Sequence, residues 1–340
     1  MQLATDTIRA AVHTALSEDH AANDVTTRWS VPEQMDVEAV IIAKQPGRVA
    51  GLPLAEGVYE AIDASVAVRR AVADGDPVHA GQALAWISGP ARSIITGERA
   101  ALNFVQRMSG IATLTSAFVA AIGQHDVKLL DTRKTAPGLR ALDKYAVTCG
   151  GGTNHRLDLA AMVLLKENHL TAAGGVRPAV RRVRDGMAAT RRHLAVEVEV
   201  TTLAEAYEAL DCQVEWIMLD NMSTDVIRSV VEQRDASGSG CRLEASGTIS
   251  LETVADIAAS GVDALSVGAL THSAPGARHQ PADQSVRASG ADCAAVSRII
   301  EVGAVRRTGR SPSTRGPRTC RPRRGARRTV RAGRSARSGR

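Results

Sequence analysis

The sequence is poor in aromatic residues and has no feature of a membrane-embedded or secreted protein. Aromatic side chains make up 2% of the 340 residues, and the basic C-terminal segment contains none, so it lacks a stacking platform for single-stranded nucleic acid. No apolar run approaches the roughly 18 residues of a membrane-spanning helix. The N-terminal residues are too polar for a secretory signal, so we expect a cytoplasmic protein without membrane contact.

Cysteine pairs with metal-ligand spacing are also absent. The five cysteines are scattered along the chain without a CxxC motif, which argues against both a zinc cage and a disulfide framework. The 44% apolar and 23% charged residues are ordinary for a globular protein, and the length suits roughly two domains.

The first third of the chain has the pattern of a helix followed by a small sheet domain. Apolar residues recur every four positions over 3–17, which predicts an amphipathic helix. Between residues 35 and 90, short apolar stretches are separated by glycine-containing turns, as is typical of strands. Helical spacing returns over 98–122, where Ser109 and Gly110 predict two helices or one broken helix.

Six apolar runs in the remainder predict parallel strands. They are VKLLDTRKT, AMVLLKENH, LAVEVEVT, WIMLDN, RLEASGTIS and ALSVGALT, and most are separated by segments of helical character. Apolar strands alternating with helices are typical of parallel sheets, and this many in series favour an α/β barrel. In such folds the chemistry lies at the carboxyl ends of the strands, and each run closes on polar or glycine residues.

Basic residues at these strand ends form a candidate anion site. Its members are Arg133, Lys134, Arg156 and Lys166. Arginine binds carboxylates in bidentate fashion, which suits a substrate with two of them. Arg140 and Lys144 fall on a predicted helix, and we interpret them as partners in surface salt bridges.

Two acidic residues, Glu199 and Asp220, end successive predicted strands and should lie close together. They would repel an anionic substrate unless a metal lay between them. Mg²⁺ accepts carboxylate oxygens and takes phosphates as other ligands, so a Mg²⁺-diphosphate ligand is implied. Two alternatives stay open: both acids form internal ion pairs with the lysines, or Glu197, on the same strand face, replaces Glu199.

The last two runs end in glycine-containing turns that precede helices. The first is Ser246-Gly247-Thr248, and the second contains Gly268. Glycine permits close backbone approach, and helix N-termini at the last strands of α/β barrels attract phosphate. The glycines at 150–152 follow no strand, and we interpret them as a flexible active-site loop.

Long motifs resemble the quinolinate phosphoribosyltransferase family, also called carboxylating nicotinate-nucleotide pyrophosphorylases, in that family's order. They are ERAALNFVQRMSGIAT, DTRKTAPGLRALDKYAVTCGGGTNHR, LLKENH, VEVEV, IMLDN, EASGTIS and DALSVGALTHS. The resemblance covers about residues 5–275. It implies an α/β protein with an N-terminal open-faced α/β sandwich domain over 1–111, and an incomplete α/β (TIM-like) barrel carrying the active site over 112–275.

The resemblance also implies an activity and a role for each site residue. Quinolinate and phosphoribosyl pyrophosphate would give nicotinate mononucleotide, CO₂ and pyrophosphate in de novo NAD biosynthesis, with Mg²⁺ and with active sites shared in a homodimer or larger homo-oligomer. Quinolinate would contact Thr132, Arg133, Lys134, His155, Arg156, Lys166, and Arg99 of the neighbouring subunit. Phosphoribosyl pyrophosphate would lie near Lys166, its metal on Glu199 and Asp220, and its 5-phosphate on Ser246, Gly247, Gly268 and His272. The catalytic set would be Lys134, Lys166, Glu199 and Asp220.

Two departures from the family keep other functions open. Asp158 and Ala161 stand where the family usually has a glycine and an acidic residue. A paralogous phosphoribosyltransferase, or a binding protein of this fold with altered substrate or lost turnover, is one alternative. A barrel aldolase that forms a Schiff base on Lys166 is another.

The C-terminal segment, residues 276–340, departs most. It contains 17 arginines, no lysine and three acidic residues, whereas the rest of the chain is net acidic. Its Arg-, Ala-, Gly- and Ser-rich composition predicts disorder, with at most a short helix over 294–305. It is either the product of a shifted reading frame, which the intact mass of the native protein would test, or a basic extension that contacts nucleic acid or acidic partners.

Overall fold

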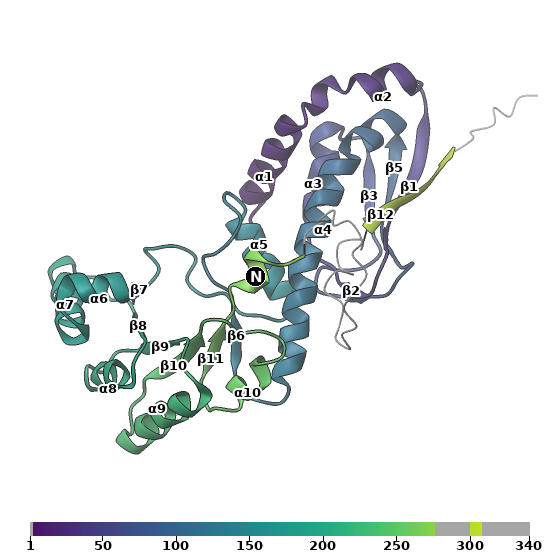
Figure 1. Cartoon of the computed structure of the whole chain (residues 1–340). Coiled ribbons are helices and arrows are strands. Elements are labelled where there is room, and N and C mark those ends of the chain that lie inside the picture. The colour runs from purple at the N-terminus through teal and green to yellow at the C-terminus, as the bar shows by residue number, and fades with distance from the viewer. Residues whose placement is uncertain (1–2, 276–299, 308–340) are drawn as a thin grey trace, which may run out of the picture. The chain divides into compact units, whose positions relative to one another are not determined.

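The structure is a computed structural model that describes residues 3–275 and 300–307 (Figure 1). The predicted disorder of 276–299 and 308–340, and the origin of that segment, lie outside the described residues. The N-terminal elements are α1 (Thr5–Glu18), η1 (Ala21–Asn23), α2 (Val25–Ser30), β1 (Asp36–Ala43), β2 (Gly47–Arg48), α3 (Leu52–Ile62), β3 (Ala67–Arg70), β4 (Pro77–Val78), β5 (Ala83–Pro90) and α4 (Ala91–Ile122). Those that follow are β6 (Lys128–Leu130), α5 (Arg140–Cys149), β7 (Val163–Leu165), α6 (Glu167–Ala173), α7 (Val176–Thr190), β8 (Val196–Val200), α8 (Leu203–Asp211), β9 (Trp216–Asp220), α9 (Thr224–Ser237), β10 (Arg242–Ser246), α10 (Val254–Ala258), β11 (Ala264–Ser266), α11 (Ala269–His272) and β12 (Ile300–Arg307).

The N-terminal domain is a four-stranded antiparallel sheet in the order β12-β1-β5-β3. Alternate residues of β1 are buried, among them Val37, Ala39 and Ile41, so one face of the sheet packs inward. Helices α3 and α4 pack against each other and contact strands of this sheet. This arrangement is the predicted open-faced α/β sandwich, and α1 is the predicted N-terminal helix.

Helix α3 was missed by the sequence analysis, which predicted only strands between residues 35 and 90. It begins after Gly51, whose φ of 99° lies in the left-handed region, and has proline in its first turn. Leu54, Ala55 and Val58 are buried on one face, at helical spacing. The helix is only 11 residues long and lies between strands, so its apolar residues were attributed to the neighbouring strands.

Helix α4 is continuous, so the prediction of two helices or one broken helix is wrong. Ser109 does not interrupt it, because its Oγ accepts a hydrogen bond from the backbone nitrogen of Ala50 at 3.0 Å and donates to the carbonyl of Ala50 at 3.2 Å. Gly110 is buried within the same turn. The helix contacts β1 and β5 of the sandwich as well as α5 and α10 of the barrel. The small size of Ser109 and Gly110 thus allows α4 to pack closely against its neighbours without interrupting the helix.

By length and composition α4 would also suffice to cross a membrane. More than half of its most apolar window is buried by packing against other elements of the protein. This is the burial expected of a core helix, so its apolar character is explained without lipid.

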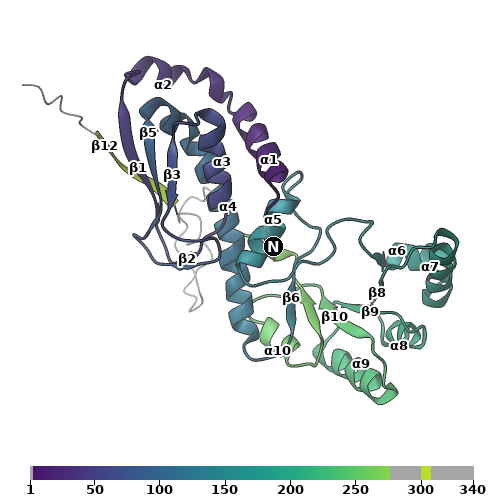
Figure 2. The same ribbon diagram turned by 180° about the vertical axis from the view of Figure 1, so that it is seen from behind.

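Strand β12 overturns the predictions of disorder or a short helix for part of the C-terminal segment. It pairs antiparallel with β1, from Val37 opposite Arg307 to Ala43 opposite Ile300, and the two strands lie side by side in both views (Figures 1 and 2). This stretch contains three β-branched residues, Ile300, Val302 and Val305, which favours a strand. The outer edge of β1 supplies the unpaired backbone groups that a lone strand needs.

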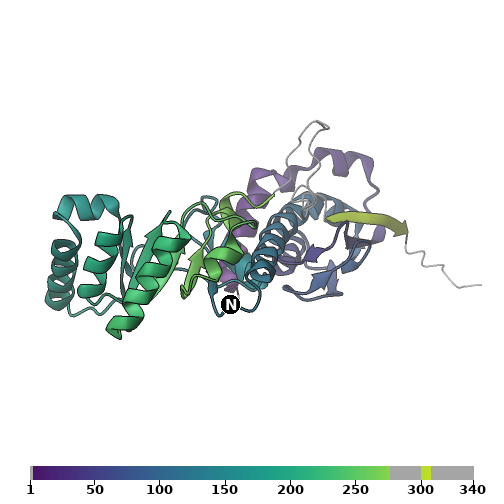
Figure 3. The same cartoon turned by 60° about the horizontal axis from the view of Figure 1, so that its bottom comes forward.

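All six apolar runs form strands of one parallel sheet, in the order β6-β11-β10-β9-β8-β7. Helices α6, α7, α8 and α9 pack in sequence beside one another (Figure 3). Within the described residues, β6 and β7 end the sheet without pairing to each other. The barrel is therefore incomplete, as predicted.

The glycines at 150–152 are close-packed against α4, so interpreting them as a flexible loop is not supported. A Cβ on Gly150 would lie 2.4 Å from the carbonyl oxygen of Ala112, and one on Gly152 would lie 2.9 Å from the side chain of Thr115. Glycine is required because the end of α5 approaches α4 too closely for a side chain.

Candidate active site

The carboxyl ends of four neighbouring strands bring predicted site residues onto one face of the parallel sheet. Glu199 pairs with Met218, and Asp220 pairs with Ser246. Paired residues of neighbouring strands face the same side, as does every second residue of one strand, so Glu199, Asp220 and Ser246 share a face. Lys166, which follows β7, joins them through an ion pair between its Nζ and the carboxylate of Glu199.

Glu197 and Glu199 lie on this face at different depths. Glu197 is fully buried, whereas the side chain of Glu199 is 15% exposed and lies at the strand end. Asp220 accepts a hydrogen bond from Asn221 Nδ2 at 3.0 Å and has no ion-pair partner among the described residues. The geometry favours Glu199 over Glu197 as the neighbour of Asp220. The pair with Lys166 also matches the ion-pair alternative, so metal binding stays a prediction.

His155 lies over a buried pair of glutamates that includes one the sequence analysis missed. Its Nε2 is 3.1 Å from Glu197 Oε2 and 3.4 Å from Glu244 Oε2, and the second oxygens of both carboxylates are buried without a partner in the described part of the chain. In the neutral imidazole, with its proton on Nε2, Nδ1 accepts a hydrogen bond from the backbone nitrogen of Arg156 at 2.6 Å, and protonation of Nδ1 would break this bond. The signal for Glu244 was an acidic residue within an otherwise apolar run.

This cluster of His155, Glu197 and Glu244 retains a proton near neutral pH. Burial lowers the pKa of His155, but its bonds with the two glutamates outweigh burial and raise that pKa to about 9. Burial raises the pKa of Glu197 to about 7. The ligand atoms lie within 4.8 Å of one another, close enough to hold a cation, and neither Glu199 nor Asp220 belongs to this group.

We expect the folded state to lose stability as pH rises from about 5 to about 9, first through Glu197 and then through His155. Both shifted groups have a folded pKa above the unfolded value, so both stabilise the fold at low pH and lose that contribution as pH rises through the folded pKa. The loss from His155 should approach about 3 kcal/mol at most. Thermal unfolding followed from pH 6 to 10 measures it. His155→Gln should flatten the curve, and an equally steep curve in this variant would contradict the assignment.

Arg133 and Arg156 lie near one another, as an anion site requires. Arg156 Nη1 donates to the carbonyl of Met162 at 3.2 Å, and burial followed by the charge of Arg133 lowers the pKa of Arg156. Arg133 Nε is buried and has no partner within the described residues. Two adjacent guanidinium groups with an unused donor suit a carboxylate ligand.

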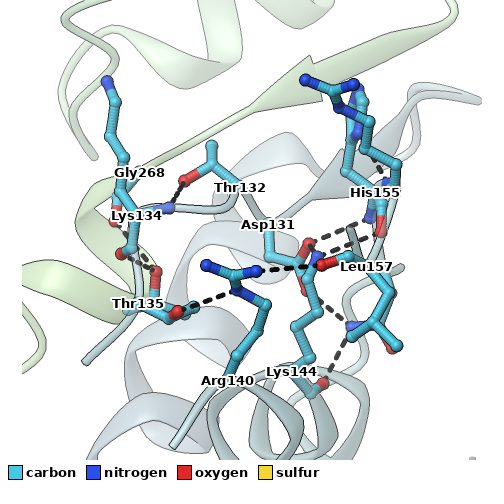
Figure 4. Close-up of polar contacts among 12 residues, drawn as sticks. Asp131, Thr132, Lys134, Thr135, Arg140, Lys144, His155, Leu157 and Gly268 are labelled. Atoms are coloured by element: carbon cyan, nitrogen blue, oxygen red, sulfur yellow. Dashed lines mark hydrogen bonds and ion pairs between the residues drawn. The ribbon is translucent and has the colours of Figure 1, made fainter. Parts of the chain in front are cut away.

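Lys134, Gly268 and His272 also come together. A Cβ on Gly268 would lie 3.1 Å from Lys134 Cδ and 3.0 Å from His272 Nε2, so both side chains pass close to the glycine. Figure 4 shows Lys134 extending past Gly268, with Thr132 Oγ1 accepting from the Lys134 backbone nitrogen at 3.0 Å. The carbonyl of Lys134 accepts from Thr271 Oγ1 at 2.8 Å, which ties the loop after β6 to α11.

Asn221 connects Asp220 to the predicted phosphate turn and was not identified from the sequence. Its Oδ1 accepts from the backbone nitrogen of Thr248 at 3.1 Å while its Nδ2 donates to Asp220. Gly247 has a φ of 126°, and a Cβ there would lie 2.3 Å from Asn221 Oδ1. Only glycine fits this turn, because the asparagine fills the space beside it.

The interpretation of Lys144 and Arg140 as surface salt-bridge residues is wrong. Lys144 is 1% exposed and forms an ion pair with the fully buried Asp131. Arg140 is half-buried and donates to Thr135 Oγ1 and to the carbonyl of Leu157, each at 3.3 Å (Figure 4). Lys144 lies on the buried face of α5, where it contacts Asp131 and the carbonyl of His155. Helical spacing alone did not indicate that this face is buried.

Three further residues noted in the sequence are exposed, and the charge of one of them, Asp158, acts on Arg156. Arg99 is exposed on α4, so its predicted contact with a neighbouring subunit stays a prediction. Asp158 and Ala161 are exposed in the loop before β7, where Asp158 Oδ1 accepts from the backbone nitrogen of Ala160 at 2.8 Å. The departures from the family pattern therefore fall on a surface turn.

Pocket size does not by itself locate the chemistry. A groove of about 1390 Å³ lies between α1 and α3, whereas a pocket of about 200 Å³ is lined by Glu199, Thr201 and residues of α6. Of the candidate residues only Glu199 lines the smaller pocket, so we place the candidate site by the strand ends that carry the paired charges and not by either pocket.

Comparison with known proteins gives consistent matches. Residues 24–109 match the quinolinate phosphoribosyl transferase N-terminal domain, and residues 111–277 match the C-terminal domain of the same family. Quinolinate phosphoribosyltransferase [decarboxylating] 1b of Nicotiana tabacum is 43% identical over 279 residues, covering 78% of this chain and 79% of the relative. The chloroplastic nicotinate-nucleotide pyrophosphorylase [carboxylating] of Arabidopsis thaliana is also 43% identical over 279 residues, covering 78% and 80%.

Solved structures agree with these relatives. NadC from Streptococcus pyogenes superposes with a TM-score of 0.78 and 34% identity, covering 91% of this chain and 100% of that chain. The nicotinate-nucleotide pyrophosphorylase from Francisella tularensis has a TM-score of 0.76 and 35% identity, covering 90% and 98%. Both domains and their order are therefore shared with these proteins.

Proposed function

This chain belongs to the quinolinate phosphoribosyltransferase family, and from this premise we propose how its strand-end residues carry out the reaction. The enzyme is a pentosyltransferase that converts quinolinate and phosphoribosyl pyrophosphate to nicotinate mononucleotide, CO₂ and pyrophosphate in NAD biosynthesis. The observation that carries the proposal is the shared face of Lys166, Glu199, Asp220 and Ser246 beside a pair of arginines.

The anionic substrates are held by complementary charges. Arg133 and Arg156 would bind the two carboxylates of quinolinate, with Thr132, Lys134, His155 and Lys166 around them. The 5-phosphate would lie at Ser246 and Gly247 and beside Gly268 and His272, where Lys134 also extends. Holding both substrates in line turns a bimolecular encounter into a reaction within one complex.

Glu199 and Asp220 fit a hard divalent cation, because both offer carboxylate oxygens on one face of the sheet and Asp220 has no cationic partner among the described residues. We propose that they hold Mg²⁺, which when bound would neutralise charge on the departing pyrophosphate. Lys166 would add a second positive charge at the same place.

The order of bond changes follows from charge. As the C1–O bond to pyrophosphate breaks, the ribose carbon becomes electron-deficient and the ring nitrogen of quinolinate attacks it. The resulting positive ring nitrogen stabilises the carbanion left at C2 when the 2-carboxylate departs as CO₂, and a proton then bonds to C2. The protein needs no general base for transfer, and its residues chiefly position anions.

Release of CO₂ from carboxyl-labelled quinolinate tests this function. We expect release that requires both phosphoribosyl pyrophosphate and Mg²⁺, with nicotinate mononucleotide formed in equal amount. No release with both present would overturn the proposal and favour a binding protein of the same fold. The aldolase alternative is disfavoured because a Schiff base needs a neutral amine, whereas Lys166 is ion-paired with Glu199. Borohydride trapping with a keto acid separates the two.

We propose that the enzyme works as a homodimer or larger homo-oligomer in which Arg99 enters the neighbouring subunit's site. Arg99 is exposed on α4, where a partner can reach it. Mixing an Arg99→Ala variant with a Lys166→Met variant should restore activity that each lacks, because some mixed sites would contain both native residues. No recovery in mixed oligomers would contradict a shared site. The cytoplasmic location stays a prediction. One relative from Arabidopsis thaliana is named as chloroplastic and one from Nicotiana tabacum as mitochondrial.

A further inference from the structure

One buried carboxylate connects the two chain segments that carry the quinolinate-binding arginines. Asp131 is fully buried at the end of β6, two residues before Arg133. Its Oδ1 accepts from the backbone nitrogen of His155 at 2.9 Å, and His155 directly precedes Arg156. This carboxylate therefore helps to fix the position of Arg133 relative to Arg156.

Lys144 and Asn154 complete the connection from beneath. Lys144 Nζ is ion-paired with Asp131 and also donates to the carbonyl of His155 at 3.0 Å. Asn154 Nδ2 donates to Asp131 Oδ2 at 2.6 Å and to the carbonyl of Lys144 at 2.8 Å. Figure 4 shows the bonds that converge between Asp131, Lys144 and His155. Both the N–H and the C=O of His155 are thus bound to one ion pair.

The cost of burying this ion pair indicates a role beyond stability. Removing two charges from water is expensive, and well-packed apolar residues of similar size are often as stabilising as a buried pair. Directional bonds to a peptide backbone fix a position, which apolar packing does less sharply. Two guanidinium groups discriminate a dicarboxylate from a monocarboxylate only if their separation is fixed.

We propose that the Asp131–Lys144 ion pair is a positioning element that sets the separation of Arg133 and Arg156 and so selects a dicarboxylate substrate. This inference rests on the proposed function, because it takes both arginines as quinolinate ligands. Asp131 and Lys144 act through the loop and do not touch the substrate themselves.

The double variant Asp131→Asn, Lys144→Met tests the proposal without leaving one charge buried alone. We expect the KM for quinolinate to rise at least tenfold, while the KM for phosphoribosyl pyrophosphate stays within twofold and kcat at saturating quinolinate within threefold. The preference for phthalate over benzoate as an inhibitor should fall at least tenfold. A merely structural role would shift both KM values together and leave the inhibitor preference unchanged.

Arg234→Met provides a matched control. Arg234 forms an ion pair with Asp263 at 2.8 Å before β11, at the opposite end of the parallel strands. We expect a lower melting temperature with both KM values unchanged. The proposal is overturned if this control moves the quinolinate KM as much, or if the double variant moves it less than twofold.

Asn154→Ala keeps the proposal testable if the double variant does not fold. It removes one donor from Asp131 and leaves the ion pair, so we expect about a threefold rise in the quinolinate KM alone, and no rise would overturn the proposal. Failure of the proposed function is distinguishable, because the wild-type enzyme would then release no CO₂ from quinolinate. Wild-type turnover with unchanged variants would overturn only the positioning role.

Discussion

Replacing Lys166 with methionine is expected to lower kcat/KM for phosphoribosyl transfer by about 100- to 1000-fold, the usual effect of removing one group that stabilises charge in the transition state. The ammonium of Lys166 is ion-paired with Glu199, on the face where we propose that pyrophosphate departs. Methionine preserves most of the side-chain length but removes the charge. Steady-state rates of CO₂ release with each substrate varied in turn measure the effect.

Lys128→Met is the matched control for this prediction. Lys128 is exposed at the first position of β6, at the opposite edge of the same sheet, so its loss should leave the rate unchanged. The side chain of Lys166 is 46% exposed, so its replacement should not unfold the barrel. A fall of less than fivefold for Lys166→Met would contradict a direct role in the reaction.

Removing Mg²⁺ with a chelator is expected to reduce turnover to background, and re-adding it should restore activity. Glu199→Gln and Asp220→Asn should each raise the Mg²⁺ concentration needed for half-maximal activity by about 10- to 100-fold, because a neutral amide is a weaker ligand for a hard cation. Asn221→Ala should cause a smaller rise in the same direction, since Asn221 orients Asp220. A Mg²⁺ titration of activity measures all three.

Glu232→Gln serves as the control because Glu232 is exposed on α9. Its Mg²⁺ requirement should equal that of the wild type. Activity that persists in excess chelator would show that Glu199 and Asp220 do not hold a required metal. In that case the main role of Glu199 would be to form the ion pair with Lys166.

The barrel was predictable because its signal is local. Each of the six strands is buried on both faces and therefore reads as an apolar run, with its reactive residues directly after it. Glu199, Asp220 and Lys166 were identified in this way. Helix α3 was missed because 11 residues between strands gave too short a period to recognise.

Burial of polar residues was not predictable in the same way. Lys144 was predicted to lie on the surface because a charged residue on a helix is usually solvated. Glu244 was included in an apolar run, and its burial beside His155 was not predicted. Both are buried because partners outside their own helix or strand, Asp131 for Lys144 and His155 for Glu244, offset the cost of desolvation. The edge position of β12 likewise depends on β1, more than 250 residues earlier in the chain.

The sequence by itself determined the α/β class, the six parallel strands and the charged groups that end them, because periodicity and strand-end position are properties of neighbouring residues. Only the tertiary structure decided that Glu199 and not Glu197 lies at the strand end beside Lys166, that His155 contacts two buried glutamates, and that Asp131 and Lys144 join two distant loops. Those outcomes depend on strand register and on which distant groups meet, and packing of the whole chain sets both.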